Sequence, residues 1–247
     1  MMMLHTKFPV QLGFNIDHIA TLRQVRGTRY PSPLEAALVA ETAGADQITL
    51  HLREDRRHIQ DSDVRVIRSE LKTRMNFEMA AVSDMVDFAI EIRPHEVCLV
   101  PEKREELTTE GGLDVLKHWN TLEDTIQRLK KEHIDVSLFV DPDLKQIEAA
   151  KETGVQIIEI HTGAYAEANT DKQQNRELSR IREAVEFGIH IGVQVNVGHG
   201  LTYHNTPAVA AIPGISVFNI GHAIVAQALF VGLPEAVRSM KRIITQR

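Results

Sequence analysis

A repeated alternation of short apolar runs, rich in β-branched residues, with longer segments of helical pattern constrains the fold more than any other feature. Eight such runs occur along the chain: Gln11–Ile16, Gln47–Leu52, Met75–Ala80, Glu96–Val100, Val136–Val140, Val155–Ile160, Gly192–Val197 and Ser216–Ile220. Their apolar content is nearly continuous, which is typical of parallel strands covered on both faces. Eight strand–helix units in 247 residues predict an α/β fold, a (β/α)8 TIM barrel with additional helices, as a single domain over residues 1–247.

The segments between these runs carry helix start and stop signals. Ser32-Pro33-Leu34-Glu35 combines an N-cap, a first-turn proline and a capping-box glutamate, and Gly44 closes that helix. Further start signals are Asp61, Ser83, Asp141-Pro142, Thr170 or Asp171, and Pro234, and the expected ends include Gly154 and about Phe187. An open doubly wound sheet is the competing layout. It usually carries a G-x-G-x-x-G turn after the first strand, which here ends in Asn15-Ile16-Asp17-His18.

Composition narrows the class of protein. The 34 acidic and 28 basic residues give a net charge of −6 with no stripe of Lys or Arg, so nucleic acid is not expected as a partner. No apolar run approaches the roughly 18–20 residues of a membrane span, and Met1–Gln11 does not resemble a secretory signal. Cys98 is the only cysteine, and we expect it in the core. These features favour a cytoplasmic enzyme that acts on a small molecule.

Polar side chains gather where the predicted strands end, which is the edge that carries the active site of such barrels. They are Asn15, Asp17 and His18; His51, Arg53 and His58; Glu78; Asp141; Glu159 and His161; Asn196 and His199; and Asn219 and His222. A single polar residue at a strand end is commonly structural, but six of the twelve histidines fall there beside several carboxylates. Glu78 and Glu159 interrupt apolar strands. Burial raises the pKa of such acids and suits them to general acid–base catalysis near neutral pH.

Glycines and arginines suggest two sites for anions. Gly198-His199-Gly200 and Gly221-His222 follow the last two strands, where barrels often bind phosphate on backbone N–H groups, although simple tight turns would explain these glycines as well. Six arginines in the first two loops could hold a second phosphate or carboxylate: Arg23, Arg26, Arg29, Arg53, Arg56 and Arg57.

Two connections are unusually long, namely Ala20–Ser32 and Pro101–Asp114. The second is polar and contains Gly111-Gly112 near its end, which is the pattern of a hinged lid or of a solvated surface loop.

Two reaction types fit the sequence poorly. A Schiff-base aldolase needs a lysine on a barrel strand, and no predicted strand contains one. A metal-dependent barrel hydrolase usually begins with two histidines one residue apart on the first strand, where this chain has Asp17-His18. We therefore expect acid–base chemistry without a metal, in which the substrates supply the reactive amine or carbonyl.

Five motifs, taken in order, closely resemble those of the pyridoxine 5'-phosphate synthase family. They are Asn15–Arg23 (NIDHIATLR), His51–Ile59 (HLREDRRHI), Leu99–Arg104 (LVPEKR) with Thr108–Asp114 (TTEGGLD), Glu159–Gly163 (EIHTG) and Gly198–Tyr203 (GHGLTY). The resemblance extends from about Gly13 to Met240. It implies condensation of 1-deoxy-D-xylulose 5-phosphate with 3-amino-2-oxopropyl phosphate to pyridoxine 5'-phosphate, phosphate and water, with no metal or organic cofactor.

The same resemblance implies roles for individual residues. His51 resembles an acid–base group in imine formation, Glu78 a general base, His199 a proton donor, and Glu159 the group that stabilises charged intermediates. Contacts to the amino-ketone phosphate are implied for Asn15, Arg26, Gly200, Gly221 and His222. Contacts to deoxyxylulose phosphate are implied for Asp17, His18, Arg53, His58 and Thr108.

The family also implies a homo-octamer, in which Arg26 would reach a neighbouring subunit's site. Two other functions stay open: a phosphate-binding barrel isomerase or lyase that acts on one sugar phosphate, and a non-catalytic sensor of a phosphorylated metabolite. Inward-pointing glutamates argue against the sensor, because an anion site gains nothing from them.

Overall fold

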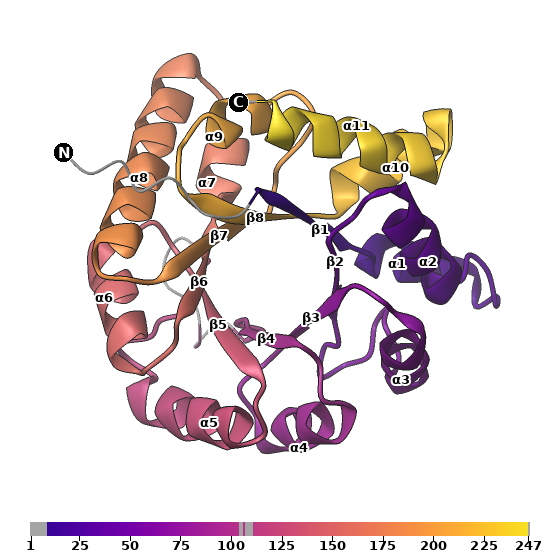
Figure 1. The fold of residues 1–247 in the computed structure, drawn as a ribbon, viewed down its shortest axis with the longest axis horizontal. Coiled ribbons are helices and arrows are strands. Elements are labelled where there is room, and N and C mark those ends of the chain that lie inside the picture. The colour runs from indigo at the N-terminus through magenta and orange to yellow at the C-terminus, as the bar shows by residue number, and fades with distance from the viewer. Residues whose placement is uncertain (1–8, 104–105, 107–110, 247) are drawn as a thin grey trace.

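Eight parallel strands close into a barrel in the computed structural model, which describes residues 9–103, 106 and 111–246. Figure 1 looks into this barrel and shows the strands in sequence order around the ring. The ring closes where Leu12 of the first strand pairs with Phe218 of the last. The strands are β1 (Gln11–Asn15), β2 (Gln47–His51), β3 (Arg74–Met79), β4 (Glu96–Leu99), β5 (Asp135–Val140), β6 (Ile157–His161), β7 (Gln194–Gly198) and β8 (Ile215–Ile220). The predicted (β/α)8 barrel is thus confirmed, and each of the eight predicted runs overlaps one strand, with bounds that differ by at most two residues at either end.

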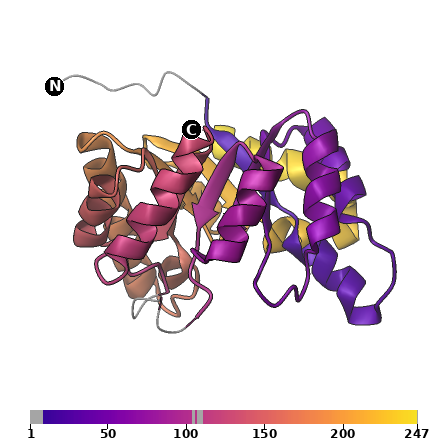
Figure 2. The same ribbon diagram turned by 90° about the horizontal axis from the view of Figure 1, so that it is seen from below.

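Helices surround the barrel, and Figure 2 shows them packed against its outer wall. They are α1 (Asp17–Arg26), α2 (Pro33–Ala43), α3 (Asp61–Glu70), α4 (Ser83–Ile92), α5 (Trp119–Lys131), α6 (Leu144–Glu152), α7 (Gly163–Ala166), α8 (Asp171–His190), α9 (Thr206–Ala210), α10 (His222–Val231) and α11 (Leu233–Thr245). The strands β1, β6 and β8 are each followed by two helices, which accounts for the additional helices of the prediction. The described helices include none that is long and apolar enough to cross a membrane.

The predicted helix boundaries hold closely in most places. The Ser32 side chain accepts a hydrogen bond from the backbone N–H of Glu35 at the start of α2, and Gly44 ends that helix in a left-handed conformation. Thr170 caps α8 as predicted. The start of α6 was predicted two residues early, because its cap is Asp143 rather than Asp141. Asp61 and Ser83 are the first helical residues of α3 and α4 rather than their caps.

The long connection predicted at Ala20–Ser32 is wrong in its first half, because residues 17–26 form α1. The helix begins one residue after β1 and has no side-chain cap at Ile16. Asp17 in its first turn and Arg23 and Arg26 in its last turn complement the helix dipole. Gly27 ends it in a left-handed conformation. The helix therefore carries Asp17 and His18 at its N-terminus, on the rim of the barrel.

Inside the barrel, polar side chains replace the usual apolar filling. Gln47 and Thr49 of β2 each donate a hydrogen bond of 3.0 Å to the Oδ1 atom of Asn219 on β8. These bonds pass over Gly13 of β1, where a Cβ atom would collide with Asn219. The Ser137 hydroxyl donates to Glu96 at 2.9 Å in the same interior. The apolar core, which includes Phe14, Phe77 and Phe218, is buried between the strands and the surrounding helices.

Candidate active site

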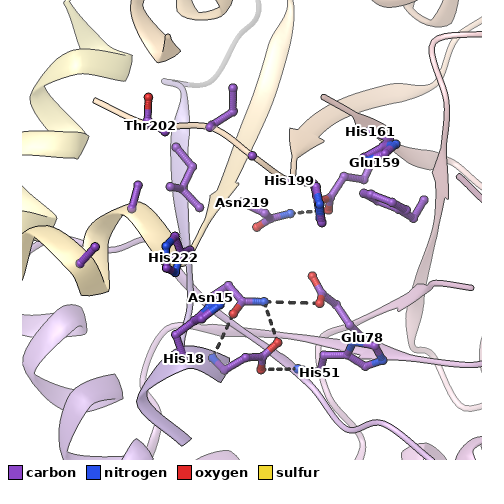
Figure 3. A pocket seen from close by; sticks show the side chains of 18 of the residues that line it. Asn15, His18, His51, Glu78, Glu159, His161, His199, Thr202, Asn219 and His222 are labelled. Carbon is purple, nitrogen blue, oxygen red and sulfur yellow. Dashed lines mark hydrogen bonds between the residues drawn. The ribbon is translucent and has the colours of Figure 1, made fainter. Parts of the chain in front are cut away.

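A cavity of about 980 Å³ opens at the carboxyl ends of the strands, where the sequence predicts the site. Eleven of the fourteen predicted site residues line it: Asn15, Asp17, His18, His51, Arg53, Glu78, Glu159, His199, Gly200, Gly221 and His222. Figure 3 shows several of them converging on one space from the ends of different strands. Barrel closure therefore assembles one pocket from residues up to 207 positions apart, the separation between Asn15 and His222.

The first cluster in the pocket joins the ends of β1, β2 and β3. The Asn15 side-chain amide donates to Asp17 at 3.1 Å and to Glu78 at 3.4 Å. Asp17 in turn accepts the backbone N–H of His51 at 2.8 Å. Strand register places His51 directly beside Glu78, because the two residues are partners in the β2–β3 ladder. The arrangement holds a carboxyl group and an imidazole side by side, as an acid–base pair requires.

The second cluster is built around Glu159 on β6. Its Oε2 atom accepts a hydrogen bond of 2.5 Å from the side-chain amide of Asn219. Gln47 and Thr49 orient this amide by donating hydrogen bonds to its oxygen. Gly198 on the neighbouring strand β7 makes room for the carboxyl group, because a Cβ atom there would collide with Oε1. Only 3% of Glu159 is exposed. The polar barrel interior thus fixes the orientation of this carboxyl group.

Burial gives both glutamates unusual proton affinity. Desolvation, followed by repulsion from Asp17 and Glu159, raises the pKa of Glu78 well above its ordinary value against the opposing hydrogen bond from Asn15. Desolvation also raises the pKa of Glu159 to about 8, with Asn219 acting in the opposite direction. Both carboxyl groups therefore hold a proton more tightly than an ordinary glutamate and can release it to a stronger base.

His199 is held in a strained backbone conformation. Its φ angle is 76°, in the left-handed region that non-glycine residues seldom adopt. The Thr162 hydroxyl lies 2.8 Å from the carbonyl oxygen of Gly198 and 2.5 Å from that of His199, which stabilises the turn. Burial, and then the neighbouring His161, lowers the pKa of His199. Its protonated form is accordingly a stronger acid than ordinary imidazolium.

A buried pair, Asp141 and His161, lies next to His199. The Nδ1 atom of His161 lies 3.0 Å from Asp141, and the ring centroids of His161 and His199 are 4.9 Å apart in an edge-to-face arrangement. Asp141 also accepts the backbone N–H of Gly112 at 3.1 Å. The second glycine of the predicted hinge is thus bonded to this pair. His161 and Asp141 were recognised in the sequence as polar strand-end residues, but only the fold shows that they are bonded.

The rim near β8 offers groups for an anion. Gly221 precedes α10 and provides no side-chain cap, so the first N–H groups of this ten-residue helix are available to a ligand. The rings of His18 and His222 lie 4.7 Å apart beside it. Burial and the neighbouring His222 lower the pKa of His18, which Asp17 partly opposes. A bound phosphate would offset the repulsion between these two imidazoles.

Two predicted residues that the structure describes do not line the pocket. His58 lies behind His51, with 6.2 Å between their ring centroids, and its Nδ1 atom accepts the backbone N–H of Ile59. Arg26 is exposed at the last turn of α1. Thr108, in the predicted lid, is outside the described residues.

One contact was missed altogether by sequence reasoning. Glu102, early in the predicted lid, lies 2.9 Å from the Nε2 atom of His51. Its only sequence signal is its place within the LVPEKR motif.

A metal site was not predicted. Among the described residues, the ligand atoms of Asp17, His51 and Glu78 lie within 4.8 Å of one another, which is close enough to hold a metal ion. The two carboxyl groups already accept hydrogen bonds from Asn15 and from the His51 backbone. The raised pKa of Glu78 also favours its protonated form, which is a poor ligand.

Comparison with known proteins identifies relatives along nearly the whole chain. Residues 12–246 match the family model described as pyridoxal phosphate biosynthesis protein PdxJ. Pyridoxine 5'-phosphate synthases of Legionella pneumophila strains Corby and Lens are each 58% identical over 235 residues, which covers 95% of both chains.

Solved structures of lower identity share the barrel fold. Phosphoribosylanthranilate isomerase from Thermotoga maritima aligns with a TM-score of 0.62 at 13% identity, over 96% of this chain and 100% of its own. Thiamine phosphate pyrophosphorylase from Pyrococcus furiosus aligns with a TM-score of 0.61 at 14% identity, over 96% of each chain. At such identities the likeness concerns the fold alone. The family match and the 58% identical relatives show that this chain belongs to the PdxJ family of pyridoxal phosphate biosynthesis proteins.

Proposed function

We propose that this chain is a pyridoxine 5'-phosphate synthase, which condenses 1-deoxy-D-xylulose 5-phosphate with 3-amino-2-oxopropyl phosphate to pyridoxine 5'-phosphate, phosphate and water. The observation that carries the proposal is the placement of Glu78, Glu159, His51 and His199 around one cavity, in a chain of this family. Such a reaction forms a carbon–nitrogen and a carbon–carbon bond and breaks carbon–oxygen bonds as water and phosphate leave, and proton transfers around an imine and its enamine accompany these steps. The two glutamates with raised pKa values and the adjacent imidazoles are suited to those transfers.

Each group has a role that follows from its position. His51 exchanges protons as the amine of one substrate adds to the carbonyl of the other. Glu78, its partner in the strand ladder, shuttles protons between the imine and the enamine. Glu159, fixed by Asn219, stabilises positive charge on the intermediates when it is ionised. His199, whose pKa is lowered by burial, donates a proton during phosphate departure or ring closure.

Two phosphate groups need two anion sites. The N-terminus of α10, with Asn15, Gly200, Gly221 and His222 around it, is suited to the amino-ketone phosphate. Asp17, His18 and Arg53 line the pocket on the β1–β2 side and are assigned to deoxyxylulose phosphate. His58 belongs to this second group through its position behind His51. Thr108 is assigned to it through the family resemblance, as part of a lid that excludes water while the imine exists.

The assembly belongs to the proposal as well. Exposed apolar side chains lie on α1 and α10, which pack against each other, and include Leu22, Val25, Leu229 and Phe230. Phe230 is 85% exposed although it borders the pocket. A second copy that covers this face, within a homo-octamer in the cytoplasm, would bring its Arg26 to the neighbouring site. Arg26→Ala should then raise the KM for the amino-ketone phosphate, whereas unchanged saturation and activity would remove Arg26 from the site.

The direct test is turnover with both substrates. Purified protein is mixed with 1-deoxy-D-xylulose 5-phosphate and freshly prepared 3-amino-2-oxopropyl phosphate, and pyridoxine 5'-phosphate is followed by mass spectrometry alongside released phosphate. Product that requires both substrates supports the proposal. Turnover of one sugar phosphate without the amine would favour an isomerase or lyase instead, and tight binding without any product would favour a sensor.

A further inference from the structure

The described part of the segment that follows β4 places one carboxylate against His51. Glu102 Oε1 lies 2.9 Å from Nε2 of the His51 ring, and Glu102 Oε2 accepts the backbone N–H of Glu54 at 3.0 Å. Arg53 lies 3.8 Å from the same carboxylate. Only 3% of the Glu102 side chain is exposed, against 13% of the His51 side chain. Such a buried, fully bonded carboxylate is typical of a group that orients a histidine.

The charge of Glu102 decides which ring nitrogen carries a proton. Burial would raise the pKa of Glu102, but the hydrogen bonds from His51 and Glu54 and the charge of Arg53 outweigh it and lower the pKa below its ordinary value. An ionised carboxylate can only accept hydrogen bonds, so Nε2 must carry the proton that is shared with it. The other nitrogen, Nδ1, is then a lone-pair acceptor in neutral imidazole and a donor in imidazolium.

We propose that Glu102 is a positioning residue that holds the Nε2 proton of His51, so that Nδ1 is the atom that exchanges protons with the substrates. This inference rests on the proposed function, because it assigns His51 to the same reaction. Strand pairing places His51 beside Glu78 (Figure 3), and one nitrogen of the ring lies within 4.8 Å of carboxylate oxygens of Asp17 and Glu78. The imidazole of His51 and the second proposed acid–base group thus share one corner of the pocket.

The backbone of Glu102 is held in place as well, because its N–H donates a hydrogen bond of 2.8 Å to the Glu106 side chain.

The decisive variant is Glu102→Gln, which keeps the size of the side chain and removes its charge. A glutamine amide can donate to Nε2 and so stabilise the opposite tautomer, with the proton on Nδ1. We expect kcat to fall about 10²–10⁴-fold, where the upper end corresponds to the loss of the aspartate that orients a catalytic histidine, with each KM within about threefold of the unmodified protein. Glu54→Gln is the matched control, because the partly exposed Glu54 side chain pairs with Lys103 and does not contact His51. Its kcat should stay within about twofold.

A double-mutant cycle and a structural measurement separate a positioning role from a merely structural one. In a His51→Asn background, Glu102→Gln should cause no further loss, because its effect passes through His51. Neutron diffraction from crystals of the unmodified protein in D₂O should locate deuterium on Nε2 of His51, without any substrate. Deuterium on Nδ1 alone, a kcat for Glu102→Gln within threefold, or a further tenfold loss in the double variant would each overturn the proposal.

The outcomes also distinguish this inference from the proposed function. Absence of pyridoxine 5'-phosphate formation by the unmodified protein would defeat the proposed function, and the neutron measurement would still decide the tautomer. Normal turnover by both the unmodified protein and Glu102→Gln would defeat the inference alone.

Discussion

Replacing Glu159 with glutamine should stabilise the folded protein at alkaline pH while it impairs turnover. Glu159 is 3% exposed, and burial raises its pKa from 4.5 to about 8. A carboxyl group with a raised pKa binds its proton more tightly in the folded state than in the unfolded state. Its contribution to stability therefore falls as pH rises from about 4.5 to about 8. Glutamine removes this penalty and keeps an oxygen that can accept the Asn219 hydrogen bond.

The size of the effect follows from the two pKa values. Each pH unit between them corresponds to about 1.36 kcal/mol, so the ionisation penalty is about 1 kcal/mol at pH 5 and about 4 kcal/mol at pH 8. The stability difference between Glu159→Gln and the unmodified protein should thus grow by about 3 kcal/mol over this range. With an unfolding entropy of roughly 2.1 cal/mol/K per residue, that corresponds to a gain of about 6 °C in Tm.

Thermal unfolding at pH 5 and pH 8, followed by circular dichroism, measures this growth directly. Titrating groups that do not interact with Glu159 are common to both proteins and cancel in the difference. Glu78 is the exception, because Glu159 raises its pKa, and loss of that repulsion changes the stability difference in the same direction. Glu148→Gln on the exposed side of α6 is the matched control, and its Tm difference should be the same at both pH values. If the Tm difference for Glu159→Gln also stays constant within about 1 °C, the carboxyl group does not carry the raised pKa and the reasoning fails.

Four further outcomes are expected. Glu78→Gln should lower turnover by roughly 10²–10⁴-fold, the usual loss for a general base, and a loss below about threefold in steady-state assays would remove Glu78 from the mechanism. The His199→Ala variant should bind both substrates in calorimetry but form product slowly. A rate of product formation equal to that of the unmodified protein would contradict the role of His199 as a proton donor. Dialysis against EDTA should leave turnover unchanged, and activity restored by a divalent cation after a loss would make Asp17, His51 and Glu78 a metal site. The Asp141→Ala substitution should lower the free energy of unfolding in urea by about 2–6 kcal/mol, because it leaves two buried hydrogen-bonding groups, the His161 ring and the Gly112 N–H, without their partner at about 1–3 kcal/mol each.

Local sequence pattern was sufficient for the strands and for most of the helices. Continuous apolar runs and capping signals such as Ser32-Pro33 are determined by neighbouring residues, so they can be recognised without the fold. The helix α1 was missed because its first residue follows β1 almost directly and Ile16 offers no side-chain cap. The signals that could have revealed it are Gly27 at its end and the arginines of its last turn.

The amino-acid sequence is sufficient to predict the barrel and the polar side chains at its carboxyl edge, because strand period and strand order place Asn15, His51, Glu78 and Glu159 at one rim of any such barrel. How these residues are bonded follows from the folded structure alone. The contacts of Glu102 with His51, and of Asn219 with Glu159, join residues 51 and 60 positions apart. The Asn219–Glu159 contact forms because barrel closure brings the strands together, and the Glu102–His51 contact forms because the segment after β4 lies against the end of β2. A local sequence pattern cannot identify a partner so distant in the chain.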